Sequence, residues 1–378
     1  MEGLRGFAAL LVFLVHFRVL FGHYAEGTAL RPVVDTLGSL GHTGVDLFFI
    51  LSGYLIYGIV MNRRFKFWRF FARRIRRLYP TFLAVFAMYV AASYFLPSRS
   101  KLPSSPREAT VYLVANLLML PGMLPIRPVI TVAWSLSYEW FFYLLMPAIV
   151  ALLRVRVWSW QWRTAFFVGL SSVLLGGSAL GVIYNSRLIL FGAGILLWEF
   201  LQRTGIPAGL PRSGEFVAAA LFALTLLAVG LFGSHVGPVV LVLEKIPRFY
   251  VISLFASGLL FILYSISYRG FLGRIFSWDP LRRVGNMSYS YYLIHGLTLK
   301  SMEVVAQRAI LSAHLSVPVF LLLFVSCLSA TLITAGVLYL GIERPLSLAQ
   351  SVGRTIAGSV AEETRADTVV ASGFVVQE

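Results

Sequence analysis

The chain has 378 residues, of which 58% are hydrophobic and 13% are charged, and its mean hydropathy is +0.81. Soluble domains carry roughly 25% charged residues, so this composition excludes a soluble enzyme and indicates a polytopic integral membrane protein. Segments of roughly twenty apolar residues satisfy their backbone hydrogen bonds internally, whereas barrel strands would alternate with a period of two. We therefore predict an all-α transmembrane helix bundle.

The apolar segments predict about ten membrane spans. They lie near residues 4–22, 42–61, 79–96, 134–153, 164–184, 187–201, 215–233, 249–268, 284–306 and 315–341. A further stretch, 109–124, is short and ends among Pro121, Gly122, Pro125 and Pro128, so we expect a re-entrant or interfacial segment there. We expect one membrane domain over residues 1–345 and a short disordered cytoplasmic tail over 346–378.

The charges in the loops predict the orientation. If residues 109–124 do not cross, twenty Lys and Arg residues fall on one side of the membrane and nine on the other. The positive-inside rule then favours ten spans with both termini in the cytoplasm. The net charge of +16 could suggest nucleic acid, but the basic residues cluster beside spans, where orientation accounts for most of them. We expect the lipid bilayer, and no nucleic acid, as the partner of these residues.

The first span is apolar except for Arg5, His16 and Arg18. Arg5 and His16 are eleven positions apart, almost three helical turns, so both point to one face, with His16 roughly 16 Å further along the axis. Ionisable groups are costly in hydrocarbon and usually mark a pathway or an active site. We predict Arg5 at the membrane edge and His16 near the middle of the bilayer, where a neutral imidazole can take a proton.

A second cluster follows the second span. Its basic run begins at Arg63, is interleaved with aromatic residues and predicts an interfacial helix, whose first half we expect to act mainly as a membrane-surface anchor. Arg73, Arg74 and Arg77 occupy its end, directly before Tyr79 and Pro80. Proline is favoured at the first position of a helix, where backbone N–H groups remain free. We therefore predict a polyphosphate site here, of the kind that coenzyme A would satisfy.

Two acids lie inside predicted spans. Asp46 follows His42 by four positions, so it could pair with this histidine. It could instead stabilise its own helix, because a negative charge near the N-terminus interacts favourably with the helix macrodipole. Glu139 is the one acid of its span and should face an arginine or a histidine across the bundle, either in a structural ion pair or in catalysis. Ser52 and Gly53 are small residues, which we expect at a close contact between helices.

The ninth span has an unusually polar first half that includes Tyr292 and His295. His295 should lie about as deep as His16, either as a hydrogen-bonded packing residue or as part of the chemistry. Trp134 belongs either to an interfacial aromatic belt or to a binding site. The chain has no Cys/His metal spacing, glycine-rich phosphate loop or nucleophile elbow, so we expect no metal and no permanently bound cofactor. His16, Glu139 and the arginines instead suit the transfer of an acyl group from an anionic carrier to a hydroxyl group.

Taken in order, these segments resemble the acyltransferase-3 family of integral membrane O-acyltransferases. The resemblance runs from Glu2 to Pro345. It rests on six motifs in the order of the family: Gly3-Leu4-Arg5-Gly6 with His16, Gly44-Val45-Asp46-Leu47-Phe48-Phe49 with Ser52-Gly53, Arg74 and Arg77 before Tyr79-Pro80, Trp134-Ser135-Leu136 with Glu139, Tyr292-Leu293-Ile294-His295, and Glu343-Arg344-Pro345.

The resemblance implies a multi-pass O-acetyltransferase of the inner (plasma) membrane. It implies acetyl-CoA or another acyl-CoA as the cytoplasmic donor, and a cell-envelope or secreted glycan or glycolipid, such as lipopolysaccharide or exopolysaccharide, as the acceptor. We expect the donor on Arg5, Arg73, Arg74 and Arg77, catalysis at His16 oriented by Glu139 or Asp46, and His295, Trp134 and Tyr292 in acceptor or structural roles.

Two other classes of protein fit the same residues. A proton-coupled transporter of a small solute or glycan also uses intramembrane His, Asp and Glu residues, as a proton relay. It would move a solute without consuming acyl-CoA. A non-catalytic scaffold of a glycan-assembly complex would tolerate substitution of Arg5 and His16 together.

Overall fold

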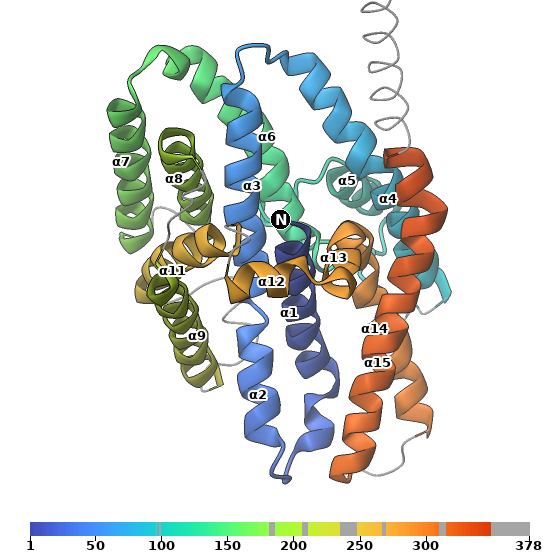
Figure 1. The fold of residues 1–378 in the computed structure, drawn as a ribbon. Coiled ribbons are helices and arrows are strands. Elements are labelled where there is room, and N and C mark those ends of the chain that lie inside the picture. Colours follow the sequence, from blue (N-terminus) through green and yellow to red (C-terminus); the bar gives the residue numbers. More distant parts are fainter. Residues whose placement is uncertain are drawn as a thin grey trace, which may run out of the picture.

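The computed structural model describes residues 1–95, 97, 100–180, 186–205, 211–234, 248–266, 270–309 and 315–348, and within them it contains helices and no β-strand. This confirms the predicted all-α fold, and Figure 1 shows the helices packed as a bundle. The α-helices are α1 (Glu2–Phe21), α2 (Arg31–Leu40), α3 (Thr43–Met61), α4 (Phe67–Phe95), α5 (Pro106–Leu117), α6 (Ala133–Leu152), α7 (Trp160–Ala179), α8 (Ile189–Thr204), α9 (Arg212–Ser234), α11 (Arg248–Ile266), α12 (Phe271–Ser277), α13 (Asp279–Asn286), α14 (Ser288–Ala309) and α15 (Val317–Leu338). Short 3₁₀ segments cover Gly22–Ala25, Val155–Val157 and Ser186–Leu188, and a π-helix, Tyr339–Leu348, continues α15.

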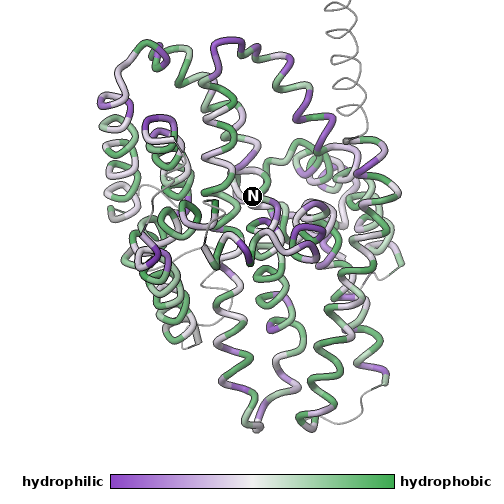
Figure 2. The backbone as a smooth tube through the Cα atoms, in the orientation of Figure 1, coloured by the Kyte–Doolittle hydropathy of each residue, from purple (hydrophilic) through white to green (hydrophobic). Residues whose placement is uncertain are grey.

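Each predicted span overlaps one of these helices. Within the described residues, seven segments are long and apolar enough to cross a membrane: Glu2–Ala25, Arg31–Met61, Phe67–Phe95, Ala133–Leu152, Arg212–Leu231, Phe249–Ile266 and Val317–Ser347. The other three predicted spans correspond to α7, α8 and α14, and α8 has 16 residues. Hydrophilic residues gather between α3 and α4 and at the start of α4, while most of the residues in the helices are hydrophobic (Figure 2).

The helix boundaries differ from the predictions in three places. The helix α2 was not predicted, and it leads almost directly into α3. The predicted helix start at Pro80 is wrong, because α4 begins at Phe67 and runs through Pro80 without a break. The predicted span 284–306 is divided at Met287, between α13 and α14. The predicted disordered tail falls largely outside the described residues, which end at Leu348.

The segment 109–124 contains the short helix α5 followed by an irregular loop. Twelve residues of α-helix are roughly 18 Å long, well short of a hydrocarbon core of roughly 30 Å. The Asn116 side chain holds the loop that follows, because its Oδ1 accepts a hydrogen bond from the Val129 N–H at 2.7 Å. This geometry is that of a re-entrant or interfacial segment.

The start of α1 lies inside the bundle. In Figure 1 the N-terminus is near the middle of the height of the molecule, with α12 and α13 running across it. Gly3 and Gly6 make this contact close, because a Cβ at either position would collide with the backbone oxygen of Phe276 or Leu281. The glycines on both sides of Arg5 therefore bring α12 and α13 against α1 and fix where Arg5 points.

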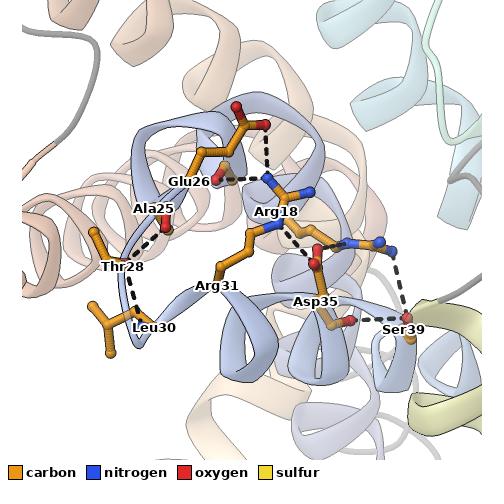
Figure 3. A network of polar contacts seen from close by, with 9 residues as sticks. Arg18, Ala25, Glu26, Thr28, Leu30, Arg31, Asp35 and Ser39 are labelled. Carbon is orange, nitrogen blue, oxygen red and sulfur yellow. Dashed lines mark hydrogen bonds and ion pairs between the residues drawn. The ribbon is translucent and has the colours of Figure 1, made fainter.

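An ion pair joins the other end of α1 to α2. Arg18 is buried, with 8% of its side chain exposed, and its Nε donates to Asp35 Oδ1 at 2.9 Å. Arg31 donates to the other oxygen of Asp35 at 2.7 Å and to Glu26 at 2.9 Å (Figure 3). The polar side chain of Arg18 in the first span is thus matched by a carboxylate from the next helix.

The crossing of α3 and α8 confirms Gly53 as a close-packing residue. A Cβ at Gly53 would collide with the Phe191 backbone oxygen, and one at Gly194 would collide with the Ile50 backbone oxygen. The two backbones are in direct contact here, with no room for a side chain between them.

We predict that Gly53→Leu lowers the melting temperature of the purified protein, because overpacking a tight contact costs roughly 1–3 kcal/mol. The melting temperature would be followed by intrinsic fluorescence in detergent. Gly169→Leu in α7 is the matched control, since a Cβ there meets nothing within 4 Å. Equal melting temperatures for the two variants would contradict the predicted contact.

Candidate active site

A pocket of about 770 Å³, counting its open mouth, lies between α1, α3, α4, α6 and α14. Its apolar lining comes mainly from α3. Its polar lining consists of Arg5, Ser52, Arg74, Arg77, Ser135, Glu139, Tyr143, Ser288, Tyr289 and Tyr292. Arg5, Arg74, Arg77 and Glu139 were singled out in three different predicted segments, and the fold brings them into this one pocket.

Glu139 is held by two hydroxyl groups. Its Oε1 accepts hydrogen bonds from Ser52 Oγ at 3.0 Å and from Tyr143 OH at 2.5 Å. Tyr143 lies one helical turn beyond Glu139 on α6, while Ser52 reaches across from α3. These bonds fix the carboxylate at the wall of the pocket and leave its second oxygen, Oε2, for other partners.

The three arginines of the pocket have no carboxylate bound to them. Within the described part of the chain, Arg5, Arg74 and Arg77 form no ion pair, although the charges of Arg77 and Glu139 both act on Arg5. Arg74 packs over the Tyr143 ring, with its guanidinium carbon 5.1 Å from the ring centroid. Three guanidinium groups against one carboxylate leave an excess of positive charge, which suits a ligand with several negative charges.

Arg73 differs from its two neighbours. Its side chain is exposed, and it is not among the residues that line the pocket. Because α4 is continuous through Pro80, free backbone N–H groups do not contribute to this anion site as predicted. The positive charge of the site comes from side chains alone.

His16 lies outside this pocket and pairs with His295. The His16 Nδ1 is 2.9 Å from the Val12 carbonyl oxygen and 3.4 Å from His295 Nε2. A carbonyl can only accept, so Nδ1 of His16 carries the proton and its Nε2 keeps a free lone pair. His295 Nδ1 donates in the same way to the Tyr291 carbonyl at 2.9 Å, which leaves its Nε2 as an acceptor for His16. The geometry therefore presents Nε2 of His16 as a base.

The expected carboxylate partner of His16 is replaced by this histidine. Glu139 binds Ser52 and Tyr143, and Asp46 binds other residues, so neither carboxylate orients His16 as predicted. Tyr292 links the histidines to the pocket. It lines the pocket, its hydroxyl is 2.6 Å from Ser135 Oγ, and its ring centroid is 6.1 Å from that of His295.

Asp46 belongs to a separate buried cluster. Its Oδ2 accepts a hydrogen bond from Tyr250 OH at 2.6 Å, and its Oδ1 lies 3.3 Å from Arg187 Nε. The Asp46 side chain is fully buried and that of Arg187 is 2% exposed. The Arg187 guanidinium also lies 5.6 Å from the Trp134 ring centroid, so Trp134 packs in this cluster. The possible pairing of Asp46 with His42 does not form.

Arg187 is a buried residue that the sequence indicated only as one of the nine basic residues on the less basic side of the membrane. Its position at the start of a short apolar segment, on the same side as Asp46 in the predicted topology, was the available signal.

For the described residues, no group of three or more His, Cys, Asp or Glu side chains could hold a metal ion.

Comparisons with known proteins support a family assignment. The family model described as an acyltransferase domain matches residues 1–339. The exopolysaccharide production protein ExoZ of Rhizobium meliloti is 28% identical over 86% of this chain and 96% of its own length. The peptidoglycan O-acetyltransferase OatA of Listeria monocytogenes is 26% identical over 78% of this chain and 48% of its own length, so the chain spans about half of that relative. No solved structure matches the chain significantly.

The ion pair of Asp46 and Arg187 can be tested by removing one or both charges. We predict that Asp46→Asn destabilises the protein by about 3–5 kcal/mol, because it removes the carboxylate that faces the buried guanidinium of Arg187. The double variant Asp46→Asn, Arg187→Met should recover much of this loss in thermal unfolding. A double variant as unstable as Asp46→Asn, or a stable Asp46→Asn, would contradict a structural pair.

Proposed function

This chain belongs to the acyltransferase family, and on that premise we propose that it transfers an acetyl group from cytoplasmic acyl-CoA to a hydroxyl group of a cell-envelope or secreted glycan. The observation that carries the proposal is the pocket in which Arg5, Arg74 and Arg77 converge without carboxylates bound to them. The names of the relatives, which refer to exopolysaccharide production and peptidoglycan O-acetylation, support a glycan acceptor.

Coenzyme A matches the pocket in charge and in polarity. Its 3′-phosphate and pyrophosphate would bind the arginines, since guanidinium groups pair with phosphate oxygens through two parallel hydrogen bonds. Its pantetheine arm would follow the apolar wall formed by Leu51, Leu55 and Leu136. Arg74 and Arg77 belong to the most basic run of the chain, which begins at Arg63 and which the positive-inside rule places at the cytoplasmic side, so the donor would enter from that side.

His16 would act as the general base. Its Nε2 takes the proton of the acceptor hydroxyl while the acceptor oxygen forms a bond to the thioester carbonyl carbon. The carbon–sulfur bond then breaks, and the thiolate of coenzyme A leaves and takes the proton from His16. The products are the acetyl ester and the free thiol.

His295 is the positioning residue of this step. Its Nε2 faces the Nδ1–H of His16, so it holds the tautomer in which His16 Nε2 is free, and it accepts more strongly once His16 becomes cationic. Glu139 would set the electrostatics of the donor pocket, because it lies among the arginines and not beside His16.

The function is tested by comparing envelope and secreted glycans from cells that lack this protein with glycans from complemented cells, by mass spectrometry. Wild-type protein should restore the acetyl groups, and His16→Ala should lower their rate of addition by at least about 100-fold, because a general base contributes roughly 10²–10⁴-fold. His295→Ala should lower kcat with little change in the KM for acetyl-CoA.

The control is His295→Gln, whose amide oxygen can still accept the His16 Nδ1–H, so it should retain more activity than His295→Ala. All variants must be present in the membrane at wild-type levels. Unchanged acetylation with His16→Ala would refute the mechanism. Transport of a solute without consumption of acyl-CoA would refute the function in favour of a transporter.

The donor site makes an independent prediction. Arg74→Gln and Arg77→Gln should each raise the KM for acetyl-CoA by about tenfold or more, because a hydrogen bond to a charged group is worth about 1.5–3 kcal/mol. The measurement is the initial rate of acetyl-CoA consumption in membrane vesicles. Arg73→Gln is the matched control, since it removes the same charge from the exposed face of the same helix turn. An equal effect of all three variants would contradict the assignment of the pocket.

A further inference from the structure

A break between two helices places a buried serine, Ser288, in the wall of the donor pocket. The helix α13 ends at Asn286 and α14 begins at Ser288, so only Met287 separates the two helices. Ser288 is 1% exposed and is among the residues that line the pocket. Its hydroxyl group has no hydrogen-bond partner among the residues that the structure describes. Because the large majority of buried polar side-chain atoms have a partner, this hydroxyl group requires an explanation.

The residues on both sides of Ser288 are held by other segments. Three residues before it, Gly285 packs against the start of α1, because a Cβ there would collide with the backbone oxygen of Glu2. Directly after it, the Tyr289 hydroxyl donates a hydrogen bond to the Leu78 carbonyl oxygen on α4 at 2.9 Å. These contacts place the serine between the start of α1 and the part of α4 that directly follows the basic run.

An arginine lies beside each of these two contacts. Arg5 follows Glu2 by three residues on α1, and Arg77 directly precedes Leu78 on α4. Both arginines line the pocket together with Ser288, and the charge of Arg77 acts on Arg5. Two like charges repel each other, so an anion bound between them would lower the energy of this arrangement.

The carboxylates near these arginines bind other groups. The charges of Glu139 and Glu343 both act on Arg5, but neither residue forms an ion pair with it among the described residues. Glu343 lies in the π-helix that continues α15, and its Oε2 accepts hydrogen bonds from the N–H of Ser290, at 3.0 Å, and from the hydroxyl group of Ser290. This carboxylate therefore holds the residue two positions beyond Ser288 and leaves the Ser288 hydroxyl group for a ligand.

We propose that Ser288, Arg5 and Arg77 form a phosphate subsite within the donor pocket. The Ser288 hydroxyl group donates a hydrogen bond to a phosphate oxygen, while the two guanidinium groups balance the negative charge and donate to the other oxygens. This inference rests on the proposed function, because the phosphate group is one of those of the acyl-CoA donor. It adds an uncharged residue that recognises the donor, and it locates one phosphate group of the donor between α1, α4 and α14.

The first test measures binding of coenzyme A to the full chain in phosphatidylcholine nanodiscs, by isothermal titration calorimetry. Ser288→Ala should weaken binding by about tenfold, because it removes one hydrogen bond to a charged group. When it is combined with Arg77→Gln, the loss should be smaller than the product of the two separate losses, since both residues would contact one phosphate group. Ser301→Ala is the matched control and should bind like wild type, because Ser301 is an exposed serine of α14 that does not line the donor pocket.

The second test separates binding from a structural role. Ser288→Ala should leave the melting temperature of the ligand-free protein unchanged, because its hydroxyl group has no partner to lose. Ser290→Ala is the contrasting variant, since it loses a hydrogen bond to Glu343 and should lower this melting temperature. Coenzyme A should then raise the melting temperature of the wild type more than that of Ser288→Ala. Equal losses for the two ligand-free variants would make Ser288 a structural residue and overturn the proposal.

The binding experiment can also contradict the proposal. Equal affinities of wild type and Ser288→Ala, no binding of coenzyme A to the wild type, or fully multiplicative effects of Ser288→Ala and Arg77→Gln would overturn it. Inorganic phosphate is the second probe, and binding as tight as that of coenzyme A, with the same dependence on Ser288, would overturn it in favour of a site for free phosphate. Displacement of coenzyme A by phosphatidylglycerol in the nanodiscs, again dependent on Ser288, would overturn it in favour of a lipid headgroup site.

The same variant separates this inference from the proposed function. Binding of coenzyme A that depends on Ser288, without any acetyl transfer to glycans, would refute the proposed function and leave the phosphate subsite intact. Acetyl transfer with the same KM for acetyl-CoA in the wild type and in Ser288→Ala would refute the phosphate subsite alone.

Discussion

The free-energy cost of burying charged side chains in an apolar helix bundle is the constraint on which the arrangement of this protein depends. An ionised side chain removed from water needs an opposite charge and good hydrogen bonds, and without them it is strongly destabilising. The described helices meet this requirement with pairs that join different elements. Arg18 binds Asp35 between α1 and α2, Arg163 binds Glu199 through two nitrogens between α7 and α8, and Arg187 lies against Asp46. Each pair therefore also determines which helices are neighbours.

The pocket of Arg5, Arg74 and Arg77 departs from this rule. Arg5, Arg74 and Arg77 have no carboxylate bound to them among the described residues, and the one acid of their pocket, Glu139, is held by hydroxyl groups. Such an excess of positive charge is tolerable where water can enter or where an anion binds. The ion pairs between helices and the binding of an anion would thus follow from the same electrostatic requirement. The arginines that lack a carboxylate partner indicate where the candidate active site lies.

The histidine pair lies next to the pocket of Arg5, Arg74 and Arg77, with Tyr292 between them. Because the partner of His16 is a neutral imidazole and not a carboxylate, the pair carries no net charge, which suits the complete burial of His295. The protein keeps its buried carboxylate, Asp46, for a structural cation instead.

The local sequence pattern was enough to predict the all-α bundle and the approximate positions of its helices. It also predicted the shared face of Arg5 and His16 and the close packing of Gly53. Hydropathy, helical period and residue size are properties of short segments, so they can be taken directly from the sequence. The pairing of charges was not predictable in this way. Glu139 lines the same pocket as the arginines, Asp46 pairs with Arg187 and His16 contacts His295 only because of how deeply each helix lies and how it is rotated. Depth and rotation are set by contacts between distant segments, such as Gly3 against Phe276 and Gly53 against Phe191, and no local pattern contains them.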